Sequence, residues 1–480
     1  MRMLTITALA FSFTALATAQ MREVWRYVYM PPQSELYAHL NRAVRLADGS
    51  LLLVGWVETP TNGHDALAIR VNPDGTEAWV YQRDGASLDD AFVDAVEAGG
   101  DLWLLAQFTD AEGYRYAEVH RLNQSGQPVQ IYALSRASNA HLRPIRLTFG
   151  ESWQPAVVAE LVQNSESLLA LYEADSFGYV FLPVGMRPWG VADPNPHFIL
   201  MLGTRASASH SVDAFSYFYD VAFLRYSGPA RGVDIPMLAT SNGMEHYWVG
   251  IQSEGGITGE DVVVLAYNAP AAMRWGYRYS YQLHDDYAED MVLDRRENLH
   301  LLVKTVLWRG EPFERHTLRL ATFSPQGALL TDTELVPDGA PILSGLLRLN
   351  DAGERYVGVS APSFFARLNP SGQPLWRQSV PMTLEALFPE TDGSVLTAGI
   401  LRIEERNEWG YWRTYERLGA IKYAPNGDLN GDGCVDDADL IAVLFAFGQS
   451  GSGLQADVNT DGVVDDADLL TVLFHFGSGC

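Results

Sequence analysis

Hydrophobic and polar residues alternate in short runs through most of the chain, and Gly-containing turns separate these runs. The run Ala68-Ile-Arg-Val71 is followed by the turn Asn72-Pro-Asp-Gly75 and then by Trp79, and the turn Asn369-Pro-Ser-Gly372 is followed by Trp376. A period of two indicates a strand, and a Gly-containing turn between two such runs indicates a β-hairpin. The pattern therefore predicts hairpins with an aromatic residue on the returning strand.

A second hairpin signal precedes the first, as in residues 46–55 and 389–399. Two hairpins per unit predict four antiparallel strands, and turns from Gly75 to Gly427 fit a repeat of about 50 residues, which is in the range of propeller blades. We therefore predict a mainly β fold over residues 20–427, a seven- or eight-bladed β-propeller of four-stranded antiparallel blades. The middle copies of the turn are faint, so both blade numbers stay open.

The two ends of this region complement each other. Residues 22–28 resemble the strand at 76–81 but have no turn before them, and the last turn, Pro425-Asn-Gly427, has no strand after it. We expect the N-terminal strand to complete the last blade, which would hide two sheet edges. The pattern resembles the delta-60-repeat and quinoprotein-like β-propellers.

Beyond residue 427 the period changes to that of a helix, and the sequence repeats itself. Residues 428–448 and 457–477 align at an offset of 29 residues, each with oxygen-bearing side chains at loop positions 1, 3, 5, 9 and 12 and Gly at position 6. This is the spacing of a 12-residue EF-hand loop, in which oxygens surround Ca²⁺ and Gly permits the sharp bend. We expect two calcium ions, with ligands Asp428, Asn430, Asp432, Asp439, the Cys434 carbonyl and Asp436 in loop one, and Asp457, Asn459, Asp461, Asp468, the Val463 carbonyl and Asp465 in loop two.

An apolar helical stripe follows each loop, no helix precedes either loop, and position 12 is Asp rather than Glu. A duplicated loop with only an exiting helix resembles a type I dockerin, so residues 428–480 are expected to form a small α-helical calcium-binding module. The resemblance implies a cohesin-like or cell-surface protein as partner and a link to polysaccharide catabolism. The positions that commonly hold Ser-Thr in dockerins hold Asp437-Ala438 and Asp466-Ala467 here, so a cap or a surface-attachment tag stays open.

Charge excludes one class of partner, and the positions of the cysteines predict a disulfide. The 480 residues carry 33 basic and 59 acidic side chains, a net charge of −26, without a Lys/Arg cluster, so we expect no nucleic-acid partner. The module has ten Asp and no Lys, Arg or Glu, and its carboxylates would repel one another until cations neutralise them. The two cysteines, Cys434 and Cys480, both lie in it; we expect a disulfide between them, with two free thiols as the alternative.

The first residues have the pattern of a secretory signal peptide. Arg2 precedes an apolar stretch from Leu4 to Leu16, which is followed by the small-residue segment Ala17-Thr-Ala19. The stretch is too short to cross a bilayer. We expect residues 1–19 to be removed after Ala19 and the mature protein to be secreted, without a membrane span.

Four acidic residues are the candidates for catalysis in the propeller. Asp90, Asp94, Asp286 and Asp290 stand at matching places in two repeats, where they would form carboxylates at the channel mouth or close turns at strand starts.

The sequence supports two hypotheses for the function of the protein. The first is a secreted calcium-binding protein whose module anchors a non-catalytic propeller binding domain on an extracellular complex or surface. The alternative is a dockerin-borne glycoside hydrolase or lyase that acts on polysaccharide at the channel mouth.

Overall fold

The computed structural model describes most of the chain. The described residues are 21–31, 36–60, 63–85, 88–134, 140–149, 155–163, 166–173, 179–181, 186–195, 198–206, 212–218, 222–226, 234–242, 246–256, 259–268, 272–339, 341–391, 393–406, 411–425, 427–429, 435–451, 454–459 and 461–477. The predicted signal peptide therefore lies outside them, as do Asn430, Asp432, Cys434 and Cys480.

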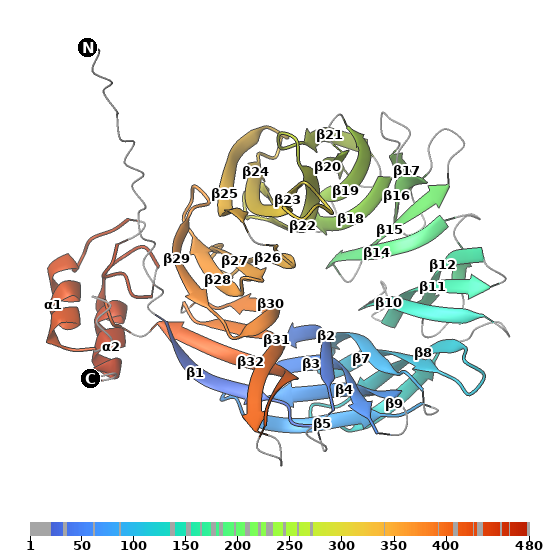
Figure 1. The fold of residues 1–480 in the computed structure, drawn as a ribbon, viewed down its shortest axis with the longest axis horizontal. Helices are drawn as coiled ribbons and strands as arrows, with labels where there is room; N and C mark the ends of the chain where they lie inside the picture. Colours follow the sequence, from blue (N-terminus) through green and yellow to red (C-terminus); the bar gives the residue numbers. More distant parts are fainter. Residues whose placement is uncertain are drawn as a thin grey trace, which may run out of the picture.

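The described part contains eight four-stranded antiparallel sheets that stand around a central axis as the blades of a propeller (Figure 1). The prediction of a mainly β fold is confirmed, and of the two blade numbers the sheets favour eight. In order along the chain, blades 1 to 4 contain β2 (Ala38–Arg45), β3 (Leu51–Thr59), β4 (Gly63–Val71) and β5 (Glu77–Arg83); β6 (Ala91–Ala98), β7 (Asp101–Thr109), β8 (Arg115–Leu122) and β9 (Pro128–Ala133); β10 (His141–Phe149), β11 (Pro155–Gln163), β12 (Glu166–Glu173) and β13 (Tyr179–Phe181); and β14 (Met186–Asn195), β15 (Phe198–Ala206), β16 (Val212–Phe218) and β17 (Ala222–Tyr226).

Blades 5 to 7 follow the same order, and blade 8 closes the ring. They contain β18 (Asp234–Ser241), β19 (His246–Gly256), β20 (Gly259–Asn268) and β21 (Ala272–Tyr279); β22 (Asp285–Leu293), β23 (Leu299–Leu307), β24 (Arg315–Phe323) and β25 (Leu329–Gly339); β26 (Ser344–Leu349), β27 (Arg355–Ser360), β28 (Phe364–Leu368) and β29 (Pro374–Ser379); and β30 (Met382–Pro389), β31 (Val395–Arg406), β32 (Trp412–Pro425) and β1 (Met21–Val28).

The expectation that the N-terminal strand completes the last blade is confirmed. Strand β1 pairs antiparallel with β32, with Met21 opposite Pro425 and Val28 opposite Gly419. A cluster of buried side chains then joins blade 8 to blade 1, among them Tyr27, Leu53 and Leu418. Two segments that are almost 400 residues apart therefore form one sheet, and the ring has no open edge at this seam.

The apolar core lies between neighbouring blades. In the second strands the alternation is lost: Leu51, Leu52, Leu53 and Val54 are all fully buried. Each blade packs a neighbour against both of its faces, so side chains on both sides of a central strand leave water. The clusters between blades 1 and 2, 5 and 6, and 6 and 7 all contain Leu, Val, Ala and Phe side chains.

A tryptophan on the outermost strand of a blade joins that blade to the next one. The indole N–H of Trp79 donates to the carbonyl of Gln124 at 3.1 Å, in the turn between β8 and β9. Gly126 of this turn has a φ of +77°, and a Cβ there would lie 2.5 Å from the Trp79 ring. The same contact, which we call the tryptophan clasp, joins Trp25 to Pro73 and Gly75 and Trp275 to Pro325 and Gly327.

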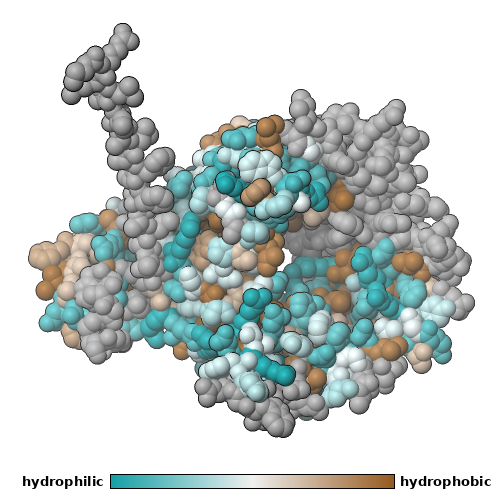
Figure 2. All heavy atoms as spheres, viewed as in Figure 1, coloured by the Kyte–Doolittle hydropathy of each residue, from teal (hydrophilic) through white to brown (hydrophobic). Residues whose placement is uncertain are grey.

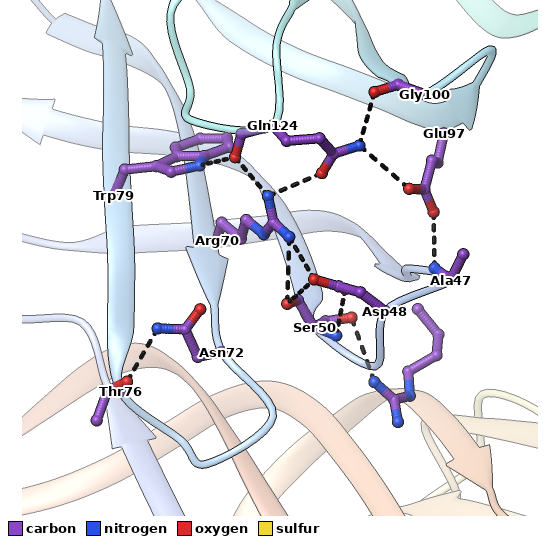
Figure 3. A network of polar contacts seen from close by, with 11 residues as sticks. Ala47, Asp48, Ser50, Arg70, Asn72, Thr76, Trp79, Glu97, Gly100 and Gln124 are labelled. Carbon is purple, nitrogen blue, oxygen red and sulfur yellow. Dashed lines mark hydrogen bonds and ion pairs between the residues drawn. The ribbon is translucent and has the colours of Figure 1, made fainter.

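Polar side chains surround the clasp between blades 1 and 2 (Figure 3). Arg70 forms an ion pair with Asp48 at 2.5 Å and also donates to the side-chain oxygen of Gln124 at 2.8 Å. The Gln124 amide in turn donates to the Gly100 carbonyl and to Glu97. The turns of two blades thus share one hydrogen-bond network. The Gly-containing turns seen in the sequence therefore connect neighbouring blades.

Two helices, α1 (Asp437–Ala446) and α2 (Asp466–His475), lie outside the ring beside β1, β29 and β32 (Figure 1). Neither helix has the length and hydropathy needed to cross a membrane, and no other helix occurs in the described residues. The two loop–helix units bond reciprocally, since Gly448 N–H donates to the Val464 carbonyl and Gly477 N–H to the Val435 carbonyl. The end of each helix therefore meets the loop of the other unit.

We expect Gly126→Ala to destabilise the propeller more than Gly113→Ala. Both residues have a positive φ, but a Cβ at Gly113 meets nothing within 4 Å, whereas at Gly126 it meets the Trp79 ring. The free energy of unfolding should fall by about 1 kcal/mol for Gly113→Ala and by about 2–4 kcal/mol for Gly126→Ala, which adds overpacking. Thermal denaturation of both variants measures the difference, and equal losses would contradict the role of the clasp.

Candidate functional site

Loop two is described at each of its predicted ligand positions. Side chains close the loop on its own backbone: Gly462 N–H donates to Asp457 Oδ2 at 2.8 Å, Asp461 N–H to Asn459 Oδ1 at 2.9 Å, and Val463 N–H to Asp461 Oδ1 at 2.9 Å. Gly462, at position 6, has a φ of +95°, which favours Gly. The bend that the spacing predicted is therefore present.

Asp457, at position 1, is a buried carboxylate with an unsatisfied oxygen. It is 6% exposed, and its Oδ1 has no hydrogen-bond partner in the described part of the chain. Burial raises the pKa of Asp457 to about 6, and the nearby Asp468 and Asp461 add to this shift. An unsatisfied carboxylate oxygen in a buried position is costly, and a cation would offset that cost.

Asp468, at position 12, connects the start of loop two to the start of α2. It is fully buried; its Oδ1 accepts from Asn459 N–H at 3.0 Å and its Oδ2 from Asp465 N–H at 2.9 Å. Burial raises the pKa of Asp468. Asp465, at position 9, is the N-cap of α2 and accepts from Ala467 N–H at 2.8 Å. Sequence reasoning identified Asp465 as a metal ligand but missed this capping role.

Loop one repeats this arrangement in its described residues. Asp439 is fully buried and accepts from Leu429 N–H at 2.6 Å and from Asp436 N–H at 2.9 Å, while Asp436 caps α1. Asp428 is buried as well. The remaining predicted ligands of loop one, Asn430, Asp432 and Cys434, lie outside the described residues.

The donor set of loop two consists of carboxylate, amide and carbonyl oxygens, which are the ligands that Ca²⁺ prefers. Within the described residues, no three His, Cys, Asp or Glu side chains already converge as a metal-binding group. The reason is visible in the contacts of Asp461 and Asp468, whose oxygens accept from backbone amides. The residues fit a calcium ion, because Asp457 Oδ1 is unsatisfied and two further carboxylates lie near it.

The two helices expose matching apolar side chains. Phe445 is 85% exposed and Phe474, the residue 29 positions later, is 81% exposed. Figure 2 shows this apolar surface in brown on the helical module at the left. The exposed set is related by the internal repeat and consists of Ile441, Leu444, Phe445 and Phe447 on and after α1 and Leu470, Leu473, Phe474 and Phe476 on and after α2.

Asp90 and Asp286 are buried where the innermost strands of blades 2 and 6 begin, Asp90 just before β6 and Asp286 as the second residue of β22. Asp90 accepts from Gly85 N–H at 2.6 Å and Asp286 from Tyr281 N–H at 2.7 Å, in each case from the residue five positions earlier. Burial raises the pKa of Asp90 to about 6 and that of Asp286 to about 8. Both side chains therefore accept a hydrogen bond from the backbone of the loop that enters a blade.

Asp94 and Asp290 join their blades to the next ones. Asp94 accepts from Leu147 N–H of blade 3 at 2.9 Å, and Asp290 accepts from Leu347 N–H of blade 7 at 2.8 Å. Arg42 and Arg146 also approach Asp94, each at 3.5 Å, and Arg348 pairs with Asp290. The four candidates thus lie in two blades that are four positions apart in the ring, and each of them contacts backbone amides.

A cavity that sequence reasoning missed lies between the propeller and loop two. Its volume is about 1050 Å³, and its walls come from the turns of blades 6 and 7, the end of β32 and the C-terminal module. No sequence motif marks it, because its residues come from segments that meet only in the folded ring. The charged residues of its wall are Asp294, Arg295, Arg296, His300, Glu354, Arg355, Arg367, Asp457 and Asp461.

No protein-family model matches the chain, and no curated protein matches it in sequence. Among solved structures, an oligogalacturonate lyase from Vibrio parahaemolyticus is 10% identical over 85% of this chain and 99% of its own, with a TM-score of 0.40. An alpha-L-arabinanase from Penicillium chrysogenum is 10% identical over 84% and 98%, with a TM-score of 0.36. A Bacteroides caccae protein of unknown function is 16% identical over 55% and 84%, with a TM-score of 0.31. Likenesses this distant say nothing of the chemistry of this chain.

We expect stability to fall as pH rises from about 4 to 8, with Asp286 as a main cause. Because the pKa of Asp286 is raised to about 8 by burial, the folded chain keeps a proton that the unfolded chain releases near its ordinary pKa of about 4. Asp286→Asn mimics the protonated acid, so the free energy of unfolding of this variant should fall less between pH 5 and pH 8.5 than that of the wild type, by on the order of 2 kcal/mol. Urea unfolding at the two pH values measures this difference. The control is Asp351→Asn in an exposed turn, and equal pH slopes for wild type and Asp286→Asn would contradict the prediction.

Proposed function

We propose that this chain is a secreted calcium-binding protein in which a dockerin-like module anchors a propeller binding domain on an extracellular complex or surface. The observation that supports it best is Asp457, a buried carboxylate with an unsatisfied oxygen at position 1 of a loop with calcium-loop spacing. Gly462 supplies the bend of this loop, and Asp468 bonds the backbone at its start. Two calcium ions would reduce the module's charge from −10 to −6.

The exposed apolar face of α1 and α2 is the proposed contact with a partner protein. Phe445 and Phe474 occupy equivalent positions and are both more than 80% exposed, while the module buries Val443 and Val472. Solvent-exposed aromatic side chains of this size are typical of protein interfaces. The partner would be a cohesin-like protein of a scaffold, or a protein of the cell surface, and a link to polysaccharide catabolism follows only from the dockerin resemblance.

The alternative, a glycan-active enzyme, has less support. Its candidate acids lie in blade 2 and blade 6, and the two members of each pair hold loops or neighbouring blades in place. A hydrolase of this class places two carboxyl groups on either side of one glycosidic bond. The contacts of Asp90, Asp94, Asp286 and Asp290 favour structural roles.

The disulfide between Cys434 and Cys480 is part of the proposal. Val435 and Gly477, which lie close to these cysteines in sequence, are joined by a 2.8 Å backbone hydrogen bond. Alkylation and mass measurement of the unreduced protein should find no free thiol. Two alkylated cysteines would contradict the disulfide.

We expect calorimetric titration of the full chain with CaCl₂ to give two bound ions and Asp457→Asn to give one. The substitution keeps the shape of the side chain but removes the charge that pairs with the ion, so loop two should bind at least about tenfold more weakly. Asp89→Asn, whose side chain is 76% exposed, is the control and should bind two ions. Absence of heat with the wild-type chain would overturn the proposal.

Chelation should unfold the module and leave the propeller folded, because calcium binding and folding are coupled through the buried carboxylates. We expect EDTA to remove helical circular dichroism and to open the module to proteolysis, without a change in the main thermal transition. A module that resists protease equally well in calcium and in EDTA would contradict this coupling.

We expect the double variant Phe445→Ser/Phe474→Ser to lose binding to a cohesin-domain or cell-surface panel by at least about 1000-fold, with calcium binding unchanged, since truncation of a central aromatic residue costs an interface about 2 kcal/mol or more. Phe313→Ser, which removes a 75% exposed side chain from blade 6, is the matched control. Surface plasmon resonance measures both. Equal binding by the double variant would show that the helix face is not the contact.

A further inference from the structure

The cavity between the propeller and loop two has one wall with cationic side chains that lack carboxylate partners. Arg355 donates to the Asn369 carbonyl at 2.6 Å and lies 3.4 Å from His300 Nδ1. Arg295 donates to the Asp351 carbonyl, and Arg296 is exposed in the same turn. Within the described residues, none of these three arginines forms an ion pair with a carboxylate.

The acidic side chains of the propeller wall already have polar partners: Asp294 Oδ2 lies 3.3 Å from His300 Nε2 and interacts electrostatically with Arg355. Asp294 accepts from the backbone and side chain of Asn298 in its own turn, and Glu354 pairs with Arg367 at 2.5 Å. Burial and the neighbouring Arg355 charge lower the pKa of His300 to about 4. The propeller wall therefore offers guanidinium groups to a ligand, and Arg367 adds a buried Nε without a hydrogen-bond partner in the described chain.

The opposite wall is loop two, through Asp457, Asp461 and Gly462. In the metal-free loop these carboxylates would repel an anion. With calcium bound they would be neutralised, and the net charge around the cavity would become positive. Arg367 already interacts electrostatically with Asp457 across this space. An anion in the cavity would thus lie between arginines on one side and a calcium loop on the other.

We infer that this cavity binds an acidic oligosaccharide, with its carboxylate or sulfate groups on Arg355 and Arg296. Guanidinium groups match both anions through paired N–H donors. At about 1050 Å³ the cavity is at the upper end of the range for ligand sites, which suits several sugar units. One aromatic ring and a spread of amide and hydroxyl groups line it, as a ligand with hydroxyls on several sides requires: Trp376, Asn298, Thr322, Thr331, Asn369 and Gln455.

This inference rests on the proposed function only for the calcium in loop two, whereas the arginine wall belongs to the propeller. It assigns a class of ligand to the propeller, and it explains why the module lies against the propeller: loop two forms one wall of the ligand cavity. Gly393 of blade 8 supports that position, since a Cβ there would lie 2.8 Å from the Asn459 carbonyl of loop two. Arg22 of β1 also bonds His475 of α2 at 2.9 Å.

The test is calorimetric titration of the full chain, in CaCl₂ and in EDTA, with four probes. These are tri-galacturonic acid, its methyl ester, a sulfated neutral oligosaccharide of similar length, and hexaglutamate. We expect the uronate or the sulfated sugar to bind, the methyl ester to bind at least tenfold more weakly, and EDTA to weaken binding at least tenfold. Comparison of the uronate with the sulfated neutral sugar, the first and third probes, distinguishes carboxylate from sulfate as the recognised group.

Two variants locate the binding in the cavity. Arg355→Gln should weaken binding at least tenfold, and Arg296→Gln, an exposed residue that does not support the fold, should weaken it several-fold. Arg402→Gln is the control, since Arg402 is 70% exposed in blade 8. Binding of neither the uronate nor the sulfated sugar beyond that of the methyl ester, unchanged binding by both cavity variants, or tighter binding of hexaglutamate would overturn the inference. If the chain binds calcium in the titration but binds none of the sugars, only this inference is overturned. If titration with CaCl₂ gives no heat, the proposed function is overturned.

Discussion

The structure depends on the need of each blade to cover both of its faces. A single four-stranded sheet of Leu, Val and Ala has two apolar faces, and only a neighbouring sheet can remove each from water. The second strands, with Leu51 to Val54 all buried, show how complete this coverage is. A ring satisfies the requirement for every blade at once, provided that it closes, and β1 provides the closure by pairing with β32.

The same requirement explains the positions of the polar side chains. Because the faces are apolar, polar links between blades gather at the strand ends, where turns meet. The tryptophan clasps and the Arg70–Asp48–Gln124 network lie there, and so do Asp90 and Asp286, whereas Asp94 and Asp290 lie within β6 and β22. Asp94 and Asp290 each reach an amide of the next blade. In this ring, acidic residues at equivalent positions of two blades therefore form hydrogen bonds between neighbouring blades.

The C-terminal module adds a contact that the ring alone does not need. It meets the turns of blades 6 to 8 through loop two, and this places the calcium-loop carboxylates opposite arginines of the propeller. Its apolar helix face points elsewhere, to solvent, where Phe445 and Phe474 are exposed. The module therefore contacts the propeller on one side and leaves its apolar helix face, the proposed partner contact, exposed on another. The cavity forms where the first side meets the ring.

The sequence by itself determined the local features: strand period, Gly turns, the four-strand repeat, the closing strand and the calcium-loop spacing. These depend on neighbours within about ten residues or on repetition, and both are visible in a linear chain. Only the tertiary structure decided the number of blades, the cavity, and the hydrogen-bond partners of Asp90, Asp94, Asp286 and Asp290. Each of these depends on which distant segments meet. Arg355, Arg367 and Asp457 line one cavity because of the ring geometry and the docking of the module, for which no local sequence pattern exists.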